Sequence, residues 1–503
     1  YDYTELPKME IADYSITANN EAISLLDDNT VFIGKNNHVV LTPNYVMDKE
    51  INAKYVWSIM PKEQPASPAS PIPADTIGTE AALDYVFKQI PGKYVLVLEV
   101  YNDAAGTNFK NIVKFNLIIE AVNGIGVLHS RASKGDISVF KTNEIDANVP
   151  ADGYTMKSDV ISSLNSGMLL NNPSFIDCDY DTKNKYNIGT SDGVSTFDIE
   201  FTYVSNNELK YAVATPAPSP ALPQSIFSSD PSTTFSFMVM NNKLWARTGK
   251  KAMMCTNLMY RFNNNDYHPF ILINDNYAGH IAFNKTSKGF EYLRQGSGLI
   301  EAWGMTNPNH PQLIIPSGEV SINDTKMDAI AFGHSANKML AIMKDASSQL
   351  HAVRFTYPES KDGKPVAACE LNNNLSGLVG MSESVVWEFG TRGQYAFYGS
   401  GNNLYVYNSD KNTSYNANLG IPSDEKINRI SILTYRKSDI GTGDKKDDYK
   451  EKRNGSVIFI ATLKNGVGKI YQFTINPSNG RPDITSKKVI TGFGEIKDIK
   501  LIR

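Results

Sequence analysis

Cysteine, tryptophan and long apolar runs are scarce in this sequence. The few cysteines exclude a disulfide-rich or zinc-ribbon protein, and the lack of long apolar runs excludes a membrane-spanning helix. The three cysteines, Cys178, Cys255 and Cys369, are spaced unlike a zinc ribbon or a disulfide framework. We expect them to be buried thiols, because free cysteine behaves as a small apolar side chain. No stretch approaches the roughly 20 apolar residues that a membrane-spanning helix needs. We therefore expect a soluble chain.

An excess of positive charge is also absent. The 49 Lys and Arg residues are balanced by 53 Asp and Glu residues, which gives a formal net charge of -4 at pH 7. A nucleic-acid-binding surface would require clustered Lys and Arg in excess. We expect no nucleic-acid partner.

Aromatic and turn-forming residues are what the sequence does contain. The chain has 26 Tyr and 22 Phe together with 35 Gly and 24 Pro, a composition typical of many short strands joined by turns. Its 503 residues exceed the usual size of one domain. These two features predict an all-β protein with more than one domain.

The clearest single pattern lies at residues 394–410. Apolar and aromatic residues alternate there in two runs, and Gly401 with its Gly and Asn neighbours supplies the positive φ angles of a turn, so the pattern predicts a hairpin. Related two-run units occur at 235–247, 330–355 and 457–475. Each unit is half of a four-stranded blade, which can bury both faces only between neighbouring blades. The repeat predicts a β-propeller.

The first 120 or so residues follow a different pattern. Roughly seven short apolar runs surround one tryptophan, Trp57, as in an immunoglobulin-like sandwich, and the proline-rich segment 64–73 predicts an exposed loop. We therefore expect an immunoglobulin-like domain at 1–122 and a propeller at 123–503. Strand pairs recur about every 55 residues in the second part, a spacing that allows six, seven or eight blades, and we expect seven.

Three further segments of the expected propeller carry predictions. Residues 495–502 mix apolar with charged side chains and are placed to pair with the first blade, which would close the ring. The proline-rich segment 215–223 and the mixed-charge segment 438–453 interrupt the strand pattern. We expect both to be loops without a core that are mobile or held by a partner.

Two sets of motifs give the sequence a family resemblance. Tyr55-Val-Trp57 and the run Gly92-Lys-Tyr-Val-Leu-Val-Leu-Glu-Val-Tyr-Asn-Asp103 resemble the pattern of PKD-type immunoglobulin-like domains. The runs at 124–130 and 134–140 resemble the first propeller strands of PKD-like surface lipoproteins of Bacteroidetes, although Ile125 stands where that family usually has Trp. The resemblance implies one sandwich followed by a propeller.

The resemblance also implies a function and a location. Members of that family are lipoproteins on the extracellular face of the outer membrane, so the chain would be attached to the membrane only by an N-terminal lipid anchor outside this sequence. The family implies an accessory role in a SusC/SusD-like TonB-dependent nutrient importer. Its partners would be that transporter and other surface lipoproteins, and its ligand an oligopeptide or a glycan.

Motifs for catalysis or metal binding are incomplete throughout the sequence. The seven histidines form no zinc motif, and neither a nucleophile elbow nor a phosphate-binding loop has the required spacing. Asp177, Asp179 and Asp181 open like a calcium loop, but Lys183 and Ile188 occupy positions that need oxygen ligands. We expect an acidic loop between blades there, no catalytic residues, no cofactor and no bound metal.

Exposed aromatic residues remain as ligand-binding candidates. Trp303 and His310 lie in 301–311, a segment rich in Gly, Asn and Pro, where a large ring could stack on a sugar or a peptide side chain. Trp245 and Trp387 lie within strand-like runs and are expected in the core.

Two other functional classes stay open at this stage. A glycan-active propeller enzyme would place an acidic cluster near the central channel. A surface adhesin would bind a host glycoprotein without an importer.

Overall fold

The computed structural model is built almost entirely of β-strands. It describes residues 9–18, 21–22, 30–35, 37–47, 53–62, 74–102, 109–179, 185–205, 222–228, 235–248, 265–273, 280–296, 299–303, 315–361 and 364–502. Contacts divide the chain into two compact units, Tyr1–Val122 and Asn123–Arg503. No helix among the described residues is long and apolar enough to cross a membrane.

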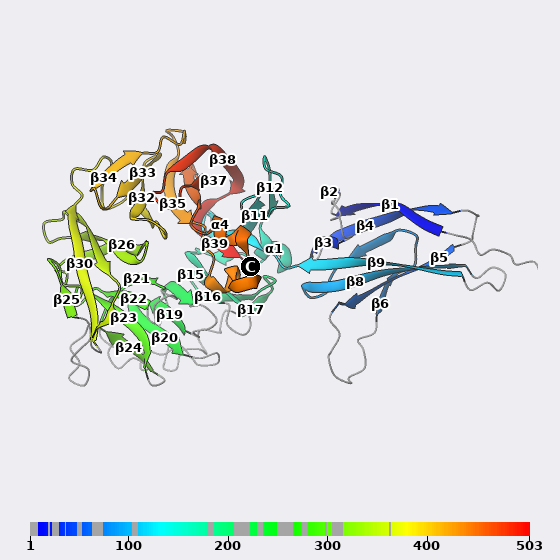
Figure 1. Cartoon of the computed structure of the whole chain (residues 1–503), viewed down its shortest axis with the longest axis horizontal. Helices are drawn as coiled ribbons and strands as arrows, with labels where there is room; N and C mark the ends of the chain where they lie inside the picture. Colours follow the sequence, from blue (N-terminus) through cyan, green and yellow to red (C-terminus); the bar gives the residue numbers. More distant parts are fainter. Residues whose placement is uncertain are drawn as a thin grey trace, which may run out of the picture. The chain divides into compact units, whose positions relative to one another are not determined.

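Unit 1 is a sandwich of two sheets (Figure 1). The first sheet has the order β2-β1-β4-β7, with β1 (Met9–Ala18), β2 (Glu21–Ala22), β4 (His38–Met47) and β7 (Leu83–Val86). The second has the order β3-β9-β8-β5-β6, with β3 (Thr30–Gly34), β5 (Ala53–Pro61), β6 (Asp75–Gly78), β8 (Gly92–Asn102) and β9 (Phe109–Glu120).

Trp57 is at the centre of the sandwich core, as the sequence predicts. Its ring is fully buried and stacks on Phe115 with 6.1 Å between ring centroids. The indole nitrogen still makes a hydrogen bond, because it donates to the carbonyl oxygen of Glu80 at 3.1 Å. A buried Trp whose N–H has a partner stabilises the sandwich without an orphaned polar group. The predicted loop 64–73 lies outside the described residues.

Among the residues that the structure describes, unit 2 contains seven sheets in chain order, which we number blade 1 to blade 7 (Figure 1). Their strands pair antiparallel, except for one parallel pair in blade 5. Blade 1 comprises β10 (Gly124–Arg131), β11 (Lys134–Thr142), β12 (Tyr154–Lys157), β13 (Leu170–Asn171) and β39 (Glu495–Ile502), and blade 2 comprises β14 (Phe175–Asp179), β15 (Lys185–Thr190), β16 (Gly193–Asp198) and β17 (Tyr203–Ser205). Blade 3 comprises β18 (Pro223–Ser228), β19 (Phe235–Met240) and β20 (Lys243–Thr248). Blade 4 comprises β21 (Tyr267–Leu272), β22 (His280–Asn284), β23 (Gly289–Gly296) and β24 (Leu299–Trp303).

Blades 5 to 7 have similar strand orders. Blade 5 comprises β25 (Ile315–Ser317), β26 (Asp328–Ser335), β27 (Lys338–Lys344), β28 (Leu350–Thr356), β29 (Glu359–Lys361) and β30 (Lys364–Asn374). Blade 6 comprises β31 (Val386–Phe389), β32 (Tyr395–Ser400), β33 (Asn403–Asn408) and β34 (Thr413–Asn416). Blade 7 comprises β35 (Lys426–Ile432), β36 (Val457–Lys464), β37 (Val467–Ile475) and β38 (Pro482–Phe493). The two-run units expected at 235–247, 330–355, 394–410 and 457–475 are all antiparallel strand pairs.

The hairpin of β32 and β33 shows why these residues form a blade. Its turn contains Gly401, whose φ of 60° suits a residue without a Cβ atom. Gly399 is required for a different reason: a Cβ atom there would lie 2.6 Å from Cγ2 of Ile427 in the next blade. The hairpin thus allows blades 6 and 7 to approach closely.

The seven sheets close into a ring. In each blade one strand is innermost, and these strands contact one another in the order β14, β18, β21, β26, β31, β35, β39 and back to β14. In Figure 1 the colours pass around this circle from cyan to red, so that the last strand meets the first blade. Unit 2 is therefore a β-propeller rather than an open solenoid.

The ring is closed by the C-terminal strand, as predicted for residues 495–502. Strand β39 pairs antiparallel with β10 and supplies the innermost strand of blade 1. Ile496, Ile499 and Ile502 of β39 are at most 3% exposed. Ile502 also packs against Gly126, where a Cβ atom would lie only 2.4 Å from it. Blade 1 therefore combines strands from the beginning and the end of unit 2, which closes the ring between blades 7 and 2.

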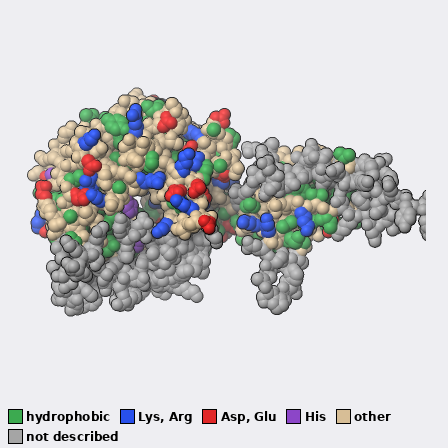
Figure 2. All heavy atoms as spheres, in the orientation of Figure 1, with side chains coloured by type: hydrophobic (Ala, Val, Ile, Leu, Met, Phe, Trp, Pro, Cys, Tyr) green, Lys and Arg blue, Asp and Glu red, His purple; other side chains and the backbone are tan. Residues whose placement is uncertain are grey.

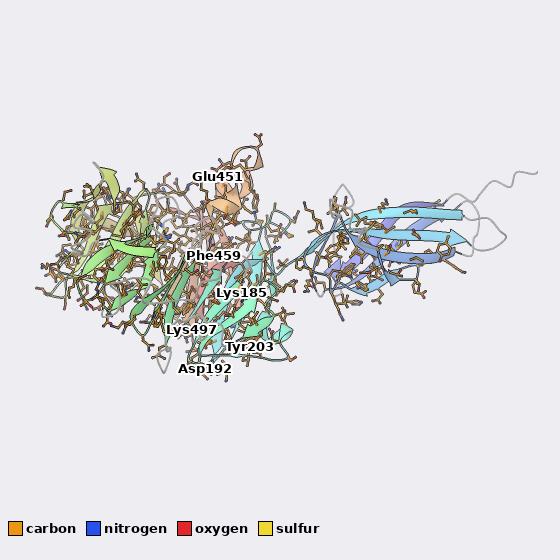
Figure 3. All side chains as sticks on the ribbon, turned by 90° about the horizontal axis from the view of Figure 1, so that it is seen from below. Lys185, Asp192, Tyr203, Glu451, Phe459 and Lys497 are labelled. Carbon is orange, nitrogen blue, oxygen red and sulfur yellow. The ribbon has the colours of Figure 1, made fainter. Side chains whose placement is uncertain are left out.

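Segment 438–453 has no buried residue in its helices, as the predicted absence of a core implies, but it is helical rather than a loop. It contains α3 (Lys437–Ile440), η2 (Gly443–Lys445) and α4 (Asp448–Arg453), and Glu451 marks it in Figure 3. The Tyr449 hydroxyl donates to the Asn143 carbonyl oxygen in blade 1, and Arg453 pairs with Glu144 at 3.1 Å. The segment is held by blade 1 of the same chain. The other predicted loop, 215–223, is described only from residue 222 onward.

Candidate functional site

The two ligand-binding residues expected from sequence are not brought into a described site. Trp303 ends β24 and pairs with Tyr292, so its backbone belongs to a strand and not to the expected loop. His310 lies outside the described residues. Trp245 is 6% exposed and packs in the core as expected, and Trp387 packs on Tyr398 with 5.2 Å between ring centroids.

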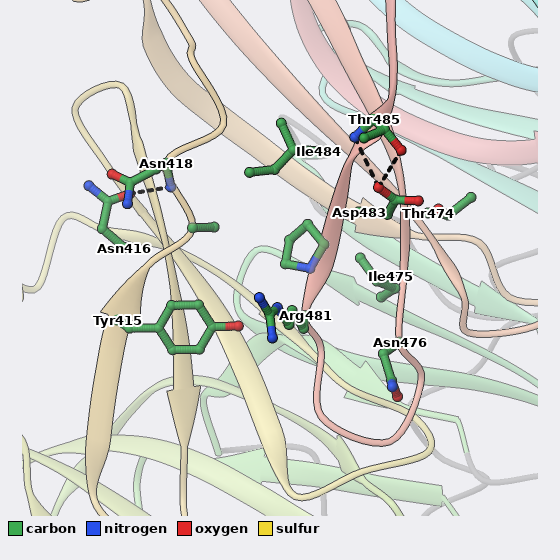
Figure 4. A pocket seen from close by; sticks show the side chains of 12 residues that line it. Tyr415, Asn416, Asn418, Thr474, Ile475, Asn476, Arg481, Asp483, Ile484 and Thr485 are labelled. Carbon is green, nitrogen blue, oxygen red and sulfur yellow. Dashed lines mark hydrogen bonds between the residues drawn. The ribbon is translucent and has the colours of Figure 1, made fainter.

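The described surface has a groove between blades 6 and 7 (Figure 4). It has a volume of about 720 Å³ and is lined by β34 on one side and by the ends of β37 and β38 on the other. These are outer strands, so the groove lies away from the central channel. We call it the blade 6–7 groove.

Tyr415 supplies the aromatic surface of the blade 6–7 groove. It lies on β34, the outermost strand of blade 6, where successive side chains point to opposite faces. The neighbouring Ser414 points inward and bonds to the Tyr398 hydroxyl, which leaves Tyr415 47% exposed. Ile484 on β38 is 53% exposed and lines the same groove. The groove thus offers two accessible apolar side chains.

Arg481 supplies the positive charge of the blade 6–7 groove. Figure 4 shows its guanidinium close to the phenol of Tyr415. Partial burial raises the pKa of Tyr415, and the Arg481 charge opposes that rise. Arg481 makes no ion pair with any residue that the structure describes. A guanidinium without a carboxylate partner is available to an anionic group of a ligand.

Asp483 is the carboxylate in the groove, and it is already engaged. One of its oxygens accepts hydrogen bonds from the backbone nitrogen of Thr485 at 2.9 Å and from its hydroxyl at 2.7 Å. These bonds favour the ionised form and lower the pKa of Asp483. Asp483 therefore shapes the turn at Thr485, at some distance along the groove from Arg481 (Figure 4).

The central channel contains a second group of charged side chains. Arg429 on β35 donates to Asp498 on β39 at 2.5 Å, and Asp498 also accepts the backbone nitrogens of Ile176 and Ile499. Asp498 is only 2% exposed. The Asp498 carboxylate thus accepts hydrogen bonds from three strands, β35, β14 and β39, and holds them together. This arrangement favours a structural role for Asp498 over the free acid that glycan hydrolysis requires.

Glu388 on β31 is the other channel carboxylate. Its side chain is partly buried. Burial raises its pKa to about 7, and the charge of Asp498 adds to this rise, whereas Arg429, Lys500 and a 3.4 Å hydrogen bond from the Ile432 nitrogen oppose it. Near neutral pH Glu388 is therefore divided between its two protonation states.

Replacing Glu388 with Gln should stabilise the protein at alkaline pH. The folded protein binds the Glu388 proton more tightly than the unfolded chain, so wild-type stability should fall as pH rises from about 4.5 through about 7. The Glu388→Gln side chain does not ionise, so the variant does not lose stability in this way. We expect its free energy of unfolding to exceed that of the wild type by roughly 1 to 3 kcal/mol at pH 8 and to be nearly equal to it at pH 5. Urea unfolding at both pH values measures this; an equal gain at both would contradict it.

One end of the central channel is bridged by Arg436. This residue follows β35 in blade 7, and its guanidinium donates to the carbonyl oxygens of Cys178 at 3.2 Å and Ser228 at 3.1 Å. Cys178 belongs to blade 2 and Ser228 to blade 3, so the side chain joins three blades. It narrows the channel at that end.

His129, Ser138 and Asp159 come together in blade 1, but they do not form a hydrolytic triad. His129 Nε2 lies 2.9 Å from the Ser138 hydroxyl, whereas its Nδ1 accepts the backbone N–H of Gly494 at 3.3 Å. The ring proton must then reside on Nε2, so this nitrogen cannot accept the serine proton. Burial lowers the pKa of His129 to about 4, and the Ser138 hydroxyl is buried as well. The group is structural.

Asp177 was predicted to lie in an acidic loop between blades, and this prediction is wrong. It lies within β14, is 7% exposed, and accepts the Ser228 hydroxyl at 2.8 Å. The buried serine stabilises the carboxylate and joins blade 2 to blade 3. No group of metal-ligating side chains is found among the residues that the structure describes.

Comparison with known proteins identifies one domain. Residues 1–173 match the model of the PKD-like family. The chain carries a PKD-like domain. The match covers unit 1 and continues into blade 1, so the predicted resemblance is supported at the level of this domain. No curated protein matches the chain.

Solved structures share the propeller architecture only distantly. The β-propeller domain of Myceliophteria thermophila Cps50 (Swd1) is 9% identical with a TM-score of 0.35, covering 64% of this chain and 88% of that one. The Nup133 β-propeller domain of Vanderwaltozyma polyspora is 10% identical with a TM-score of 0.33, covering 65% and 90%. An extracellular domain from B. thetaiotaomicron is 12% identical with a TM-score of 0.31, covering 63% and 33%. The fold assignment rests on the closed ring itself.

Sequence reasoning missed the blade 6–7 groove. Its signals were present: Tyr415 sits between polar residues on a short strand, and Arg481 follows the turn-rich run 476–480. The two residues lie on different blades, and only the ring brings them together.

Proposed function

We propose that the chain is a non-catalytic ligand-binding lipoprotein of the bacterial cell surface that serves a SusC/SusD-like TonB-dependent importer. The blade 6–7 groove is the observation that carries the binding role, because it combines accessible apolar side chains with an uncommitted cation. A closed ring holds such a groove rigidly, which lowers the entropic cost of binding. The PKD-like domain supports the cell-surface location.

In this proposal the two units divide the work. Unit 2 captures or positions an oligopeptide or glycan for the importer, and unit 1 acts as a spacer, as sandwich domains commonly do. An N-terminal lipid would hold the protein at the extracellular face of the outer membrane. Lys and Arg side chains lie among Asp and Glu over the face of unit 2 shown in Figure 2, so contacts with protein partners need not depend on one sign of charge.

Co-purification from native outer membranes tests this proposal. The full-length protein with a C-terminal tag should bring down a TonB-dependent transporter and a second surface lipoprotein. The variant Tyr415→Ala should bring down the same proteins, because the groove binds ligand and not the transporter. Recovery of the wild type only as a free periplasmic monomer would contradict the proposal.

A further inference from the structure

We propose that the blade 6–7 groove binds an acidic polysaccharide, with a sugar carboxylate on Arg481 and a sugar ring against Tyr415. This inference rests on the proposed function and names the ligand class for that site. It depends on three properties of the groove: an available cation, an accessible aromatic face and a polar wall.

The cation is the first property. Lys487, near the groove, is committed, since its Nζ donates to the carbonyl oxygens of Leu419 at 3.2 Å and Gly420 at 3.1 Å. Arg481 has no acidic partner among the described residues. A guanidinium can hold a carboxylate through two parallel hydrogen bonds, which a neutral sugar cannot form.

The apolar surface is the second property. Tyr415 and Ile484 face the groove from opposite blades and are both about half exposed. A pyranose ring presents C–H groups on its faces and hydroxyl groups at its rim. It can therefore cover an aromatic ring while keeping its polar groups in water or on polar side chains. A sugar chain can therefore contact both side chains from one side of its ring while its hydroxyl groups reach the polar residues of the groove.

The polar wall is the third property. Asn416, Asn418, Asn476, Thr474 and Thr485 also line the groove. Asn416 is partly used, because its amide donates to Asn403 at 3.0 Å and its carbonyl accepts the Asn418 nitrogen at 2.9 Å. The exposed side chain of Asn418 remains accessible to sugar hydroxyls, and so does the amide nitrogen of Asn476, whose side-chain oxygen accepts the Ser478 nitrogen at 2.9 Å. Side chains of this kind bind hydroxyl groups through single hydrogen bonds.

Binding of one polysaccharide in two chemical forms tests the inference. The probes are oligogalacturonate and the same oligomer with every carboxyl group methyl-esterified, titrated calorimetrically into the full-length chain at 50 mM salt. We expect the free acid to bind at least tenfold more tightly. Arg481→Gln should remove this preference, and Arg481→Lys should retain part of it, because a lysine keeps the charge but not the paired hydrogen bonds.

Two further variants make the result specific. Tyr415→Ala should weaken binding of both oligomers, because each loses its stacking surface. Lys326→Gln removes one positive charge from a turn outside the groove, where the Lys326 side chain is 82% exposed, and should leave the acid preference unchanged. Thermal unfolding confirms that each variant is folded.

Several outcomes would overturn the inference. These are equal affinity for acid and ester, an acid preference that survives Arg481→Gln, or tighter binding of an acidic peptide of similar length than of either sugar. Each would leave the proposed importer function standing if co-purification succeeds. Conversely, acid-selective binding without any co-purifying transporter would support the ligand class and contradict the importer role.

Discussion

Replacing Asp498 with Ala should lower the free energy of unfolding by about 3 to 5 kcal/mol. Asp498 is buried at the ring closure, where its carboxylate accepts Arg429 at 2.5 Å and the backbone nitrogens of Ile176 at 3.0 Å and Ile499 at 2.9 Å. The alanine would leave the two backbone N–H groups without an acceptor, and Arg429, whose side chain is 41% exposed, would be left to water. Urea unfolding followed by tryptophan fluorescence and by circular dichroism measures the loss.

Two control variants distinguish the closure from a general effect of charge. Asp498→Asn preserves the shape and one acceptor oxygen, so its loss should be smaller than that of Asp498→Ala. Asp424→Asn breaks the ion pair of Asp424 with Lys464 on the surface of blade 7, and its stability should equal that of the wild type within error. An Asp498→Ala variant as stable as the wild type would show that β39 does not hold the ring.

Acid should destabilise the protein before most of its carboxylates titrate. Burial lowers the pKa of His129, His268 and His280 to about 4 each, and it also lowers the pKa of His334. The unfolded chain binds these protons near pH 6.5, while the folded protein does not. Stability is therefore complete above about pH 6.5 and should fall as pH decreases toward 4, by up to about 4 kcal/mol per pH unit for three histidines.

Two substitutions and one variant background test this acid dependence. His280→Phe should remove about a third of the slope, because a phenyl ring cannot bind a proton and can keep the edge-on contact with Phe237. The exposed His38 provides the control, and His38→Asn should leave the slope unchanged. Measurements in the Glu388→Gln background remove the opposing effect of that carboxylate. A flat stability between pH 6.5 and 4.5 would contradict the burial of these histidines in neutral form.

The fold could be predicted from sequence because its signals are local. Alternation in the 394–410 hairpin and in the other two-run units is set by which face of each strand is buried, and this can be read one strand at a time. The closing strand was also predictable, since Ile496, Ile499 and Ile502 recur among charged residues at the end of a chain that needs one more strand.

The sites could not be predicted because they are assembled from separate blades. Tyr415 and Arg481 meet only when blades 6 and 7 pack together. Asp177 was expected to be exposed because carboxylates usually are, and its burial depends on Ser228 in another blade. Segment 438–453 has a solvent-like composition, yet Tyr449 and Arg453 fasten it to blade 1. Composition predicts exposure, but not a contact between residues far apart in the chain.

Native-state hydrogen exchange of the β39 amides tests the closed ring most directly. In a ring held by its last strand, the β39 amides paired with β10 should exchange only by global unfolding, as slowly as amides of the buried strand β36. Asp498→Ala should speed exchange in β39 and β10 before it does so in blade 5. Rapid exchange of β39 by local opening in the wild type, with the other blades still protected, would contradict the closed ring on which the blade 6–7 groove depends.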